Sequence, residues 1–131
     1  MRGGAFARML SDGRAAALAL HERVRSDRRF IPAAAPELDI VVWAPRCARA
    51  SETAGIARRI FVQAARRHLY LALAELPADF LDPGAGPFER DRATVTCLRS
   101  VLMKPEHRGW VDRIWQLLDR ATGAVLEVGS L

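Results

Sequence analysis

The sequence predicts an α+β domain: a small antiparallel sheet of three to four strands with helices packed on one face. Two observations support this fold class. Apolar residues recur at three- and four-residue steps in three separate stretches, as on one face of a helix. Between them lie short runs rich in β-branched and aromatic residues, as in strands. The chain of 131 residues is half apolar, which suits one domain. We place that domain at residues 1–122, with a tail at 123–131.

The first half of the chain predicts a helix, a short extended piece, a strand and a second helix. An apolar stripe indicates a helix over about residues 5–26. A short extended piece at 29–31 follows. Residues 38–43 then predict a strong strand, which is apolar on both faces and is therefore expected to be central. Ser51 is expected to cap a second amphipathic helix, whose apolar stripe covers residues 56–64.

The second half predicts two more strands and a third helix. Residues 69–74 and 93–103 form the predicted strands, and the proline- and glycine-rich segment 77–92 between them is expected to be a long exposed loop. The third helix is expected to begin near Pro105, and Gly123 suits its C-terminal cap. These helices leave the other face of the sheet without a helical cover.

The formal charge of +5 comes almost entirely from arginine, because Lys104 is the only lysine. The arginines are spread along the chain with carboxylates between them, which is typical of a solvated mixed-charge surface. Nucleic acid is therefore not the favoured partner. A free-standing basic α+β module that binds nucleic acid or an acidic protein remains the alternative.

The chain is expected to be cytoplasmic and to have no membrane partner. No apolar stretch approaches the roughly 20 residues that a membrane span needs. The first residues contain no uninterrupted apolar run of the kind found in secretory signals.

No metal site is predicted. His21, His68 and His107 belong to separate predicted elements and form no metal-type pair, and the first and last are expected on the surface. Cys47 and Cys97 match no metal-binding spacing and are interpreted as two reduced thiols.

No catalytic residue is predicted either. Glu37 and Asp39 share one face of a strand, but they follow a proline and are interpreted as a turn that leads into the strand. Lys104 precedes Pro105 in a predicted exposed turn, where nothing would desolvate its amine and lower the pKa.

Arg99 is the unusual residue of the sequence. It lies in a predicted strand between Cys97 and Val101, on the same face, where a guanidinium is costly unless it is paired. Two partners remain open: a carboxylate of this domain, or an anion or partner-domain carboxylate that is met across the uncovered sheet face. Guanidinium geometry suits bidentate carboxylate binding in either case.

Four segments in order, 28–32, 36–43, 94–105 and 111–118, resemble the C-terminal small domain of group II pyridoxal-phosphate-dependent amino-acid decarboxylases. This is the aromatic-amino-acid and glutamate decarboxylase-like family of fold type I. The first two segments resemble its acidic, aromatic turn and the strand P-x-L-x-I-V-x-F. The third resembles its V-L-R-x-x-x-x-x-P strand and turn, and the fourth its terminal helix.

The resemblance implies that the chemistry of such an enzyme lies outside this chain. The family's cofactor lysine, the partner of the pyridine nitrogen and the ring-stacking histidine belong to a large domain and have no counterpart here. The chain alone is therefore expected to bind no pyridoxal phosphate and to be inactive. By resemblance, Arg99 lies where the small domain packs against that large domain, in the same or a separate chain of a homodimeric enzyme.

The sequence departs from the family pattern in two places, and the second departure indicates a subgroup with its own specificity, or one that is no longer a decarboxylase. Trp43 is followed by Ala44 where the family strand often has arginine, and the segment 77–92 is longer than expected. A third possibility is a domain that mainly dimerises through its open sheet face.

Overall fold

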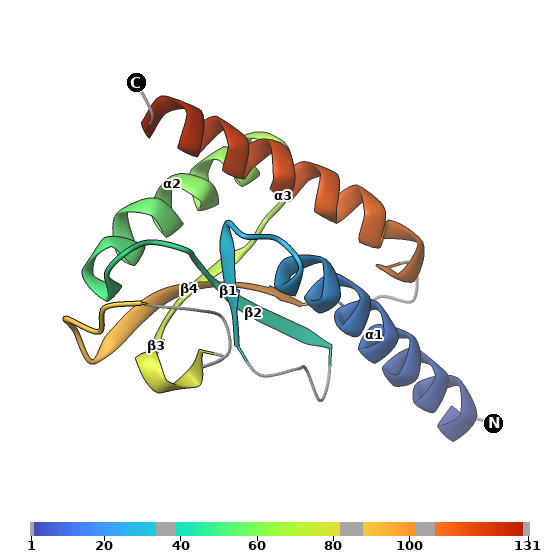
Figure 1. Cartoon of the computed structure of the whole chain (residues 1–131). Helices are drawn as coiled ribbons and strands as arrows, with labels where there is room; N and C mark the ends of the chain where they lie inside the picture. Colours follow the sequence, from blue (N-terminus) through green and yellow to red (C-terminus); the bar gives the residue numbers. More distant parts are fainter. Residues whose placement is uncertain (1, 34–38, 82–87, 102–106, 130–131) are drawn as a thin grey trace.

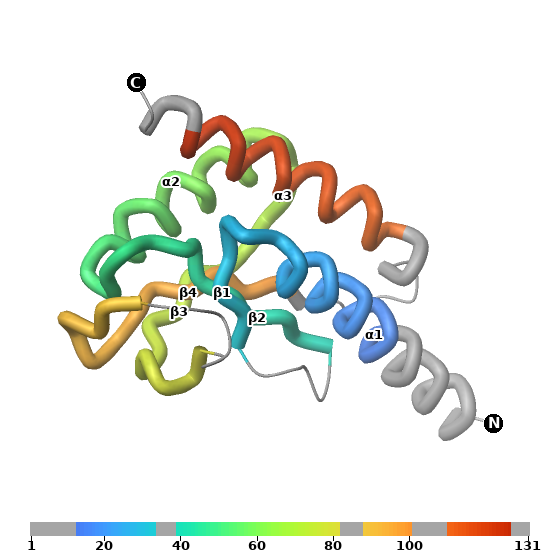
Figure 2. The backbone as a smooth tube through the Cα atoms, in the orientation of Figure 1, coloured from blue at the N-terminus to red at the C-terminus, as the bar shows by residue number. Residues whose placement is uncertain are grey.

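The computed structural model describes the backbone of residues 2–33, 39–81, 88–101 and 107–129 (Figure 1). Side chains are described over 13–33, 39–81, 88–100 and 110–126, the part that Figure 2 draws in colour. The elements, in chain order, are α1 (Arg2–Arg25), β1 (Phe30–Pro32), β2 (Ile40–Pro45), η1 (Ala50–Glu52), α2 (Thr53–Arg66), β3 (Ala72–Pro77), η2 (Ala78–Phe80), β4 (Thr94–Val101) and α3 (His107–Gly129).

The sheet has four strands in the order β1-β2-β4-β3, and all neighbours are antiparallel. The predicted α+β fold is confirmed. β2 and β4 are the central strands. The central position of β2 had been predicted because its residues are apolar on both faces. In Figure 1, α2 and α3 lie side by side over one face of the sheet, and the second half of α1 packs on the same side, against α3, β1 and β2.

The main core lies between the sheet and the helices. Trp43 of β2 and Leu98 of β4 are fully buried there, against residues of all three helices. Phe30 contacts two indoles edge-on, with ring centroids 6.4 Å from Trp43 and 6.0 Å from Trp115. Such edge-to-face pairs stabilise a core beyond the area that they bury. This aromatic cluster ties β1, β2 and α3 together.

A second, smaller core covers part of the opposite sheet face. Val95 and Cys97 occupy alternate positions of β4, and they pack with Ala78 and Leu81. The prediction that 77–92 is simply an exposed loop is therefore wrong for its first residues. Ala78 and Leu81 are three positions apart on one turn around η2, so both reach the sheet and are buried.

Two predicted helix caps are also wrong. α2 begins at Thr53, and Ser51 belongs to η1, where its backbone N–H and its hydroxyl donate to Asp91. α3 continues past Gly123 to Gly129 because its apolar stripe continues, with Val125 still buried. Most of the segment 123–131, which was predicted to be a tail, is therefore helical. The domain boundary at residue 122 remains a prediction.

The second predicted strand is displaced along the chain. β3 runs from Ala72 to Pro77 instead of over 69–74. His68, with φ of 64°, ends α2 in the left-handed conformation, and the N–H of Leu69 donates to the carbonyl of Ala64. This is a Schellman motif. Leu69, which the apolar pattern had assigned to the strand, belongs to this helix-ending motif instead.

Candidate functional site

Arg99 lies in the middle of the sheet on the face that the helices do not cover. In β4 it is aligned with Val42 of β2 on one side and with Ala72 of β3 on the other. Because side chains alternate along a strand, Arg99 shares the face of Val95 and Cys97, which pack in the second core. Val42, the register partner of Arg99, still packs against that core, but Arg99 does not belong to it and the Arg99 side chain is exposed. The guanidinium is therefore available to a partner that approaches this face.

The residues that surround Arg99 form a largely apolar surface. Val42 of β2 and Ala72 of β3 are the neighbours of Arg99 on the adjacent strands. Ile40 is two positions from Val42 and Ala74 is two positions from Ala72, so both lie on the same face of the sheet. All four residues are half-buried. Tyr70 stands between Leu69 and Leu71, both in the helix-side core, and is 75% exposed. We call the surface formed by Ile40, Val42, Ala72, Ala74 and Arg99 the Arg99 face.

Arg99 has no carboxylate partner among the residues whose side chains are described. In that same part of the chain, other arginines do form ion pairs, such as Arg23 with Asp112 and Arg49 with Glu89. Two partners for Arg99 were left open by the sequence, and the ion pairs of the described residues do not include one between Arg99 and a carboxylate of this domain. The charge of Arg99 is solvated here, and it would need an anion if the face became covered.

Among the residues whose side chains are described, the remaining candidates form no catalytic cluster. His21 is buried on α1, contrary to its expected surface position, because it lies beside Leu20 on the inward face of the helix. His68 ends α2, and His107 begins α3 with a side chain outside the described residues. Asp39 is half-buried before β2, whereas Glu37 and Lys104 lie outside the described residues. No group of histidine, cysteine and acidic side chains in the described residues could hold a metal ion.

Both cysteines are protonated thiols at neutral pH. Burial raises the pKa of Cys97 to about 11, and burial with the nearby Glu52 charge raises the pKa of Cys47 to about 11. Cys47 also donates to the carbonyl of Pro45 at 3.3 Å. A thiol in this state is a poor nucleophile.

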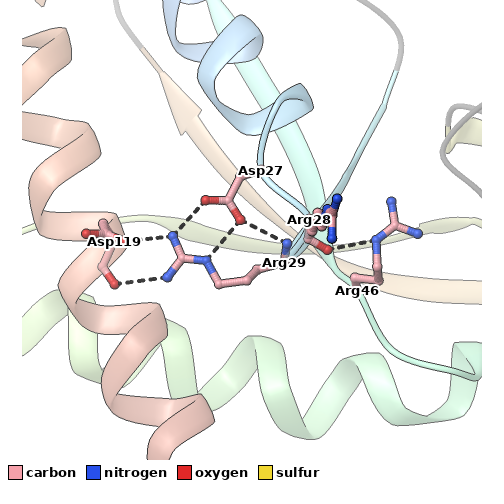
Figure 3. A network of polar contacts seen from close by, with 5 residues as sticks. All are labelled: Asp27, Arg28, Arg29, Arg46 and Asp119. Atoms are coloured by element: carbon pink, nitrogen blue, oxygen red, sulfur yellow. Dashed lines mark hydrogen bonds and ion pairs between the residues drawn. The ribbon is translucent and has the colours of Figure 1, made fainter.

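A charged network that was not predicted from the sequence lies at the junction of α1, β1 and α3 (Figure 3). Arg29 donates to both carboxylate oxygens of Asp27, at 2.8 and 2.9 Å, and to Asp119 of α3 at 2.7 Å. These bonds lower the pKa of Asp27 and raise that of Arg29. Asp27 and Arg29 are two residues apart, which is a local signal. Asp119 is 90 positions from Arg29, and no local pattern could have identified it.

Comparison with solved structures places this arrangement in a known context. Oryza sativa TDC, solved with PLP and tryptamine, superposes with a TM-score of 0.66 at 17% identity over 88% of this chain. Catharanthus roseus tryptophan decarboxylase gives a TM-score of 0.64 at 17% identity over 89% of this chain. The glutamate decarboxylase domain of a Vibrio parahaemolyticus transaminase and L-2,4-diaminobutyrate decarboxylase protein gives 0.56 at 15% identity over 87%.

This chain has the fold of the C-terminal domain of pyridoxal-phosphate-dependent decarboxylases. The decarboxylase C-terminal domain fold was the one that the sequence resemblance implied. The chain spans about a fifth of the solved decarboxylase chains, 22%, 21% and 22% of the three. No protein-family model and no curated protein sequence matches it. Within the described residues, no helix has the length and apolar character to cross a membrane.

Proposed function

We propose that this chain is the C-terminal domain of a pyridoxal-phosphate-dependent amino-acid decarboxylase, a lyase, and that the Arg99 face packs against a cofactor-binding large domain. The large domain would belong to the same or a separate chain, in a homodimeric cytoplasmic enzyme. One observation carries the proposal: nearly nine-tenths of this chain superposes on about a fifth of each decarboxylase chain. The rest of those chains is then the natural candidate for the partner.

The character of the Arg99 face supports docking to a protein surface. Its half-buried apolar residues surround a single charge, and an interface core is typically apolar with few charged residues, among which arginine is enriched. Tyr70, two residues before Ala72 in the chain, adds an exposed aromatic ring, and aromatic residues are also enriched in such cores. Once covered, the guanidinium would require a carboxylate from the partner, and this requirement makes the contact specific.

The described residues do not fit the cofactor. Pyridoxal-phosphate enzymes hold it as a Schiff base on a lysine. Lys104 is the single lysine of the chain and lies outside the described residues. We therefore assign no step of the reaction to this chain and expect it to be inactive alone. Borohydride reduction of the chain with pyridoxal phosphate should leave no stoichiometric adduct on Lys104.

The proposal is tested by expressing the chain with the cofactor-binding region encoded in the same gene or beside it. We expect the two parts to co-purify, and we expect decarboxylation of an aromatic amino acid, glutamate or 2,4-diaminobutyrate only when both are present. Absence of any such coding region, or equal activity without this chain, would overturn the proposal.

One observation favours a second function, a basic module that binds nucleic acid or an acidic protein. The outer face of α2 carries Arg58, Arg59 and Arg66, and α2 contains no acidic residue. Among the residues with described side chains, none of these three forms an ion pair. Binding to duplex DNA that falls steeply with salt would support this function. The absence of binding even at low salt would exclude it for DNA.

A further inference from the structure

We propose that a depression on the helix layer is a binding site for phosphate or a small phosphomonoester. Its volume is about 510 Å³, and it lies where the α1–β1 turn, the end of α2 and the second half of α3 meet. This is the side of the sheet opposite the Arg99 face, so the proposal does not depend on docking to a large domain. The lining residues are Arg29, Arg67, Asp119, Arg120, Gly123 and Ala124.

Arg67 is held at the rim of this depression by the end of α2. It is the C-cap residue of that helix, just before the left-handed His68. Its Nη1 donates to the carbonyl of Gln63 at 3.0 Å and to the side-chain oxygen of Gln63 at 2.8 Å. These bonds use one nitrogen and fix the orientation of the half-buried side chain. Nε and Nη2 remain as donors without an acceptor among the residues whose side chains are described.

Arg29 and Asp119 form the fixed wall of the depression. Arg29 is bonded to both Asp27 and Asp119, so these carboxylates are already engaged. Arg120 follows Asp119 on α3, is exposed, and has no carboxylate partner within the described part of the chain. Around the depression, Arg29 pairs with Asp27 and Asp119, whereas Arg67 and Arg120 form no ion pair with any carboxylate whose side chain is described.

This arrangement suits the chemistry of a phosphate group. A phosphate offers several acceptor oxygens, and guanidinium donors on two separate elements can bind different oxygens at once. Gly123 has no side chain and Ala124 has only a methyl group, and apart from the two neighbouring residues and the backbone of α3 itself, no atom lies within 4 Å of a Cβ placed on Gly123. The space beside the two arginines can therefore admit the organic part of a phosphomonoester.

The test is a titration of the isotope-labelled chain with inorganic phosphate, followed by NMR at low ionic strength. We expect saturable shifts at residues of the depression. Arg67→Gln and Arg120→Gln should each weaken phosphate binding by about 10-fold, which corresponds to the loss of one charge-assisted contact. The matched control is Arg113→Gln, which removes an exposed arginine from α3 outside the depression and should change the affinity by less than about two-fold.

Equal weakening by Arg113→Gln, or shifts that never saturate, would overturn the proposal and indicate a diffuse basic surface. The same spectra show whether each variant is folded, and Arg120→Gln changes only an exposed side chain. Glycerol phosphate serves as the second probe. Binding at least as tight as that of inorganic phosphate supports a phosphomonoester site, whereas exclusion of glycerol phosphate would contradict that part of the proposal and restrict the ligand to the free ion.

Discussion

Thr53 joins the start of α2 to the central strand β4 through one hydroxyl group. Its Oγ1 donates to the carbonyl of Ala50 at 2.7 Å and accepts the N–H of Thr96 at 3.0 Å, and the residue is 1% exposed. Thr53→Val keeps the shape but leaves both partners unsatisfied. We expect it to lower the free energy of unfolding by about 2 kcal/mol, measured by urea denaturation.

Thr53→Ser is the matched control, because it keeps the hydroxyl and removes only a methyl group. It should lose about 1 kcal/mol. If the valine variant were as stable as the serine variant, the two hydrogen bonds would not contribute as described.

The two thiols should differ from a free cysteine and from each other in their reactivity. With a pKa of about 11, each is almost entirely protonated at pH 8. We expect alkylation by iodoacetamide at pH 8 to be at least about 10-fold slower than that of glutathione. Cys97 is buried and should react more slowly than the half-buried Cys47. Mass spectrometry of timed samples measures both rates, and rapid modification of Cys97 would show that the second core is not closed around it.

At this scale the sequence located some residues and not others, for physical reasons. Alternation along one strand was enough to assign Arg99 to the face of Cys97. The exposure of Arg99 depends on which part of the sheet is covered by the residues around η2. That packing is a tertiary contact, and the local sequence pattern does not predict it. The phosphate-site arginines likewise come from separate elements, and only the packing of α2 against α3 brings them together.

The turn between α1 and β1 is stabilised by Asp27, whose pKa is below its ordinary value of 3.8 because Arg29 bonds to it. The carboxylate therefore stabilises the fold fully above that ordinary value, and the contribution is lost as the pH falls through the lower folded value. We expect Asp27→Asn to reduce the free energy of unfolding at pH 7 by about 2 kcal/mol. The difference from the unaltered chain should shrink below pH 3.8.

Thermal or urea unfolding at several pH values measures this dependence. Glu22→Gln is the control, because Glu22 pairs with Arg25 on the open surface of α1 and should change stability little. A difference between the unaltered chain and Asp27→Asn that persisted unchanged to pH 2 would contradict the role of the carboxylate charge.

The type and order of the three helices and of the three longer strands followed from the apolar patterns, whereas β1 was expected only as a short extended piece and several element ends were not predicted. The first predicted helix and the strands around Val41 and Cys97 were correctly placed because apolar spacing extends over many residues there. The start of β3 was missed because the turn after α2, in which the non-glycine residue His68 adopts the left-handed conformation, includes residues that had been assigned to the strand. Gly123 was expected to end the third helix, but α3 continues because its apolar stripe extends beyond Gly123. Propensity at one position yields to packing along a whole helix face.

For the whole molecule, the resemblance in four short segments identified a fold that full sequence comparison does not reach. Identity to the solved decarboxylases is 15% to 17%, although the backbones superpose with TM-scores of 0.56 to 0.66. Apolar cores accept many substitutions provided that volume and pattern are kept. The order of apolar strands and stripes therefore persists when residue identity has been lost.

The domain's two layers divide the proposed roles. The helix side of the sheet is covered by the main core. Among the residues whose side chains are described, the opposite face is covered by the second core near η1 and η2, and Arg99 lies outside that core. Arg99→Glu should weaken association with the large domain. It should leave the stability of this domain nearly unchanged, because Arg99 is exposed and has no ion pair in the described part of the chain.

The most direct test of this account is to titrate the chain into the separately expressed large domain by calorimetry. We expect Arg99→Glu to weaken association at least about 100-fold, because a repulsive carboxylate pair replaces an attractive contact. Arg113→Glu, the same charge change on the opposite layer, should alter the affinity by less than about three-fold. Equal effects of the two variants, or an unchanged affinity for Arg99→Glu, would contradict docking through the Arg99 face.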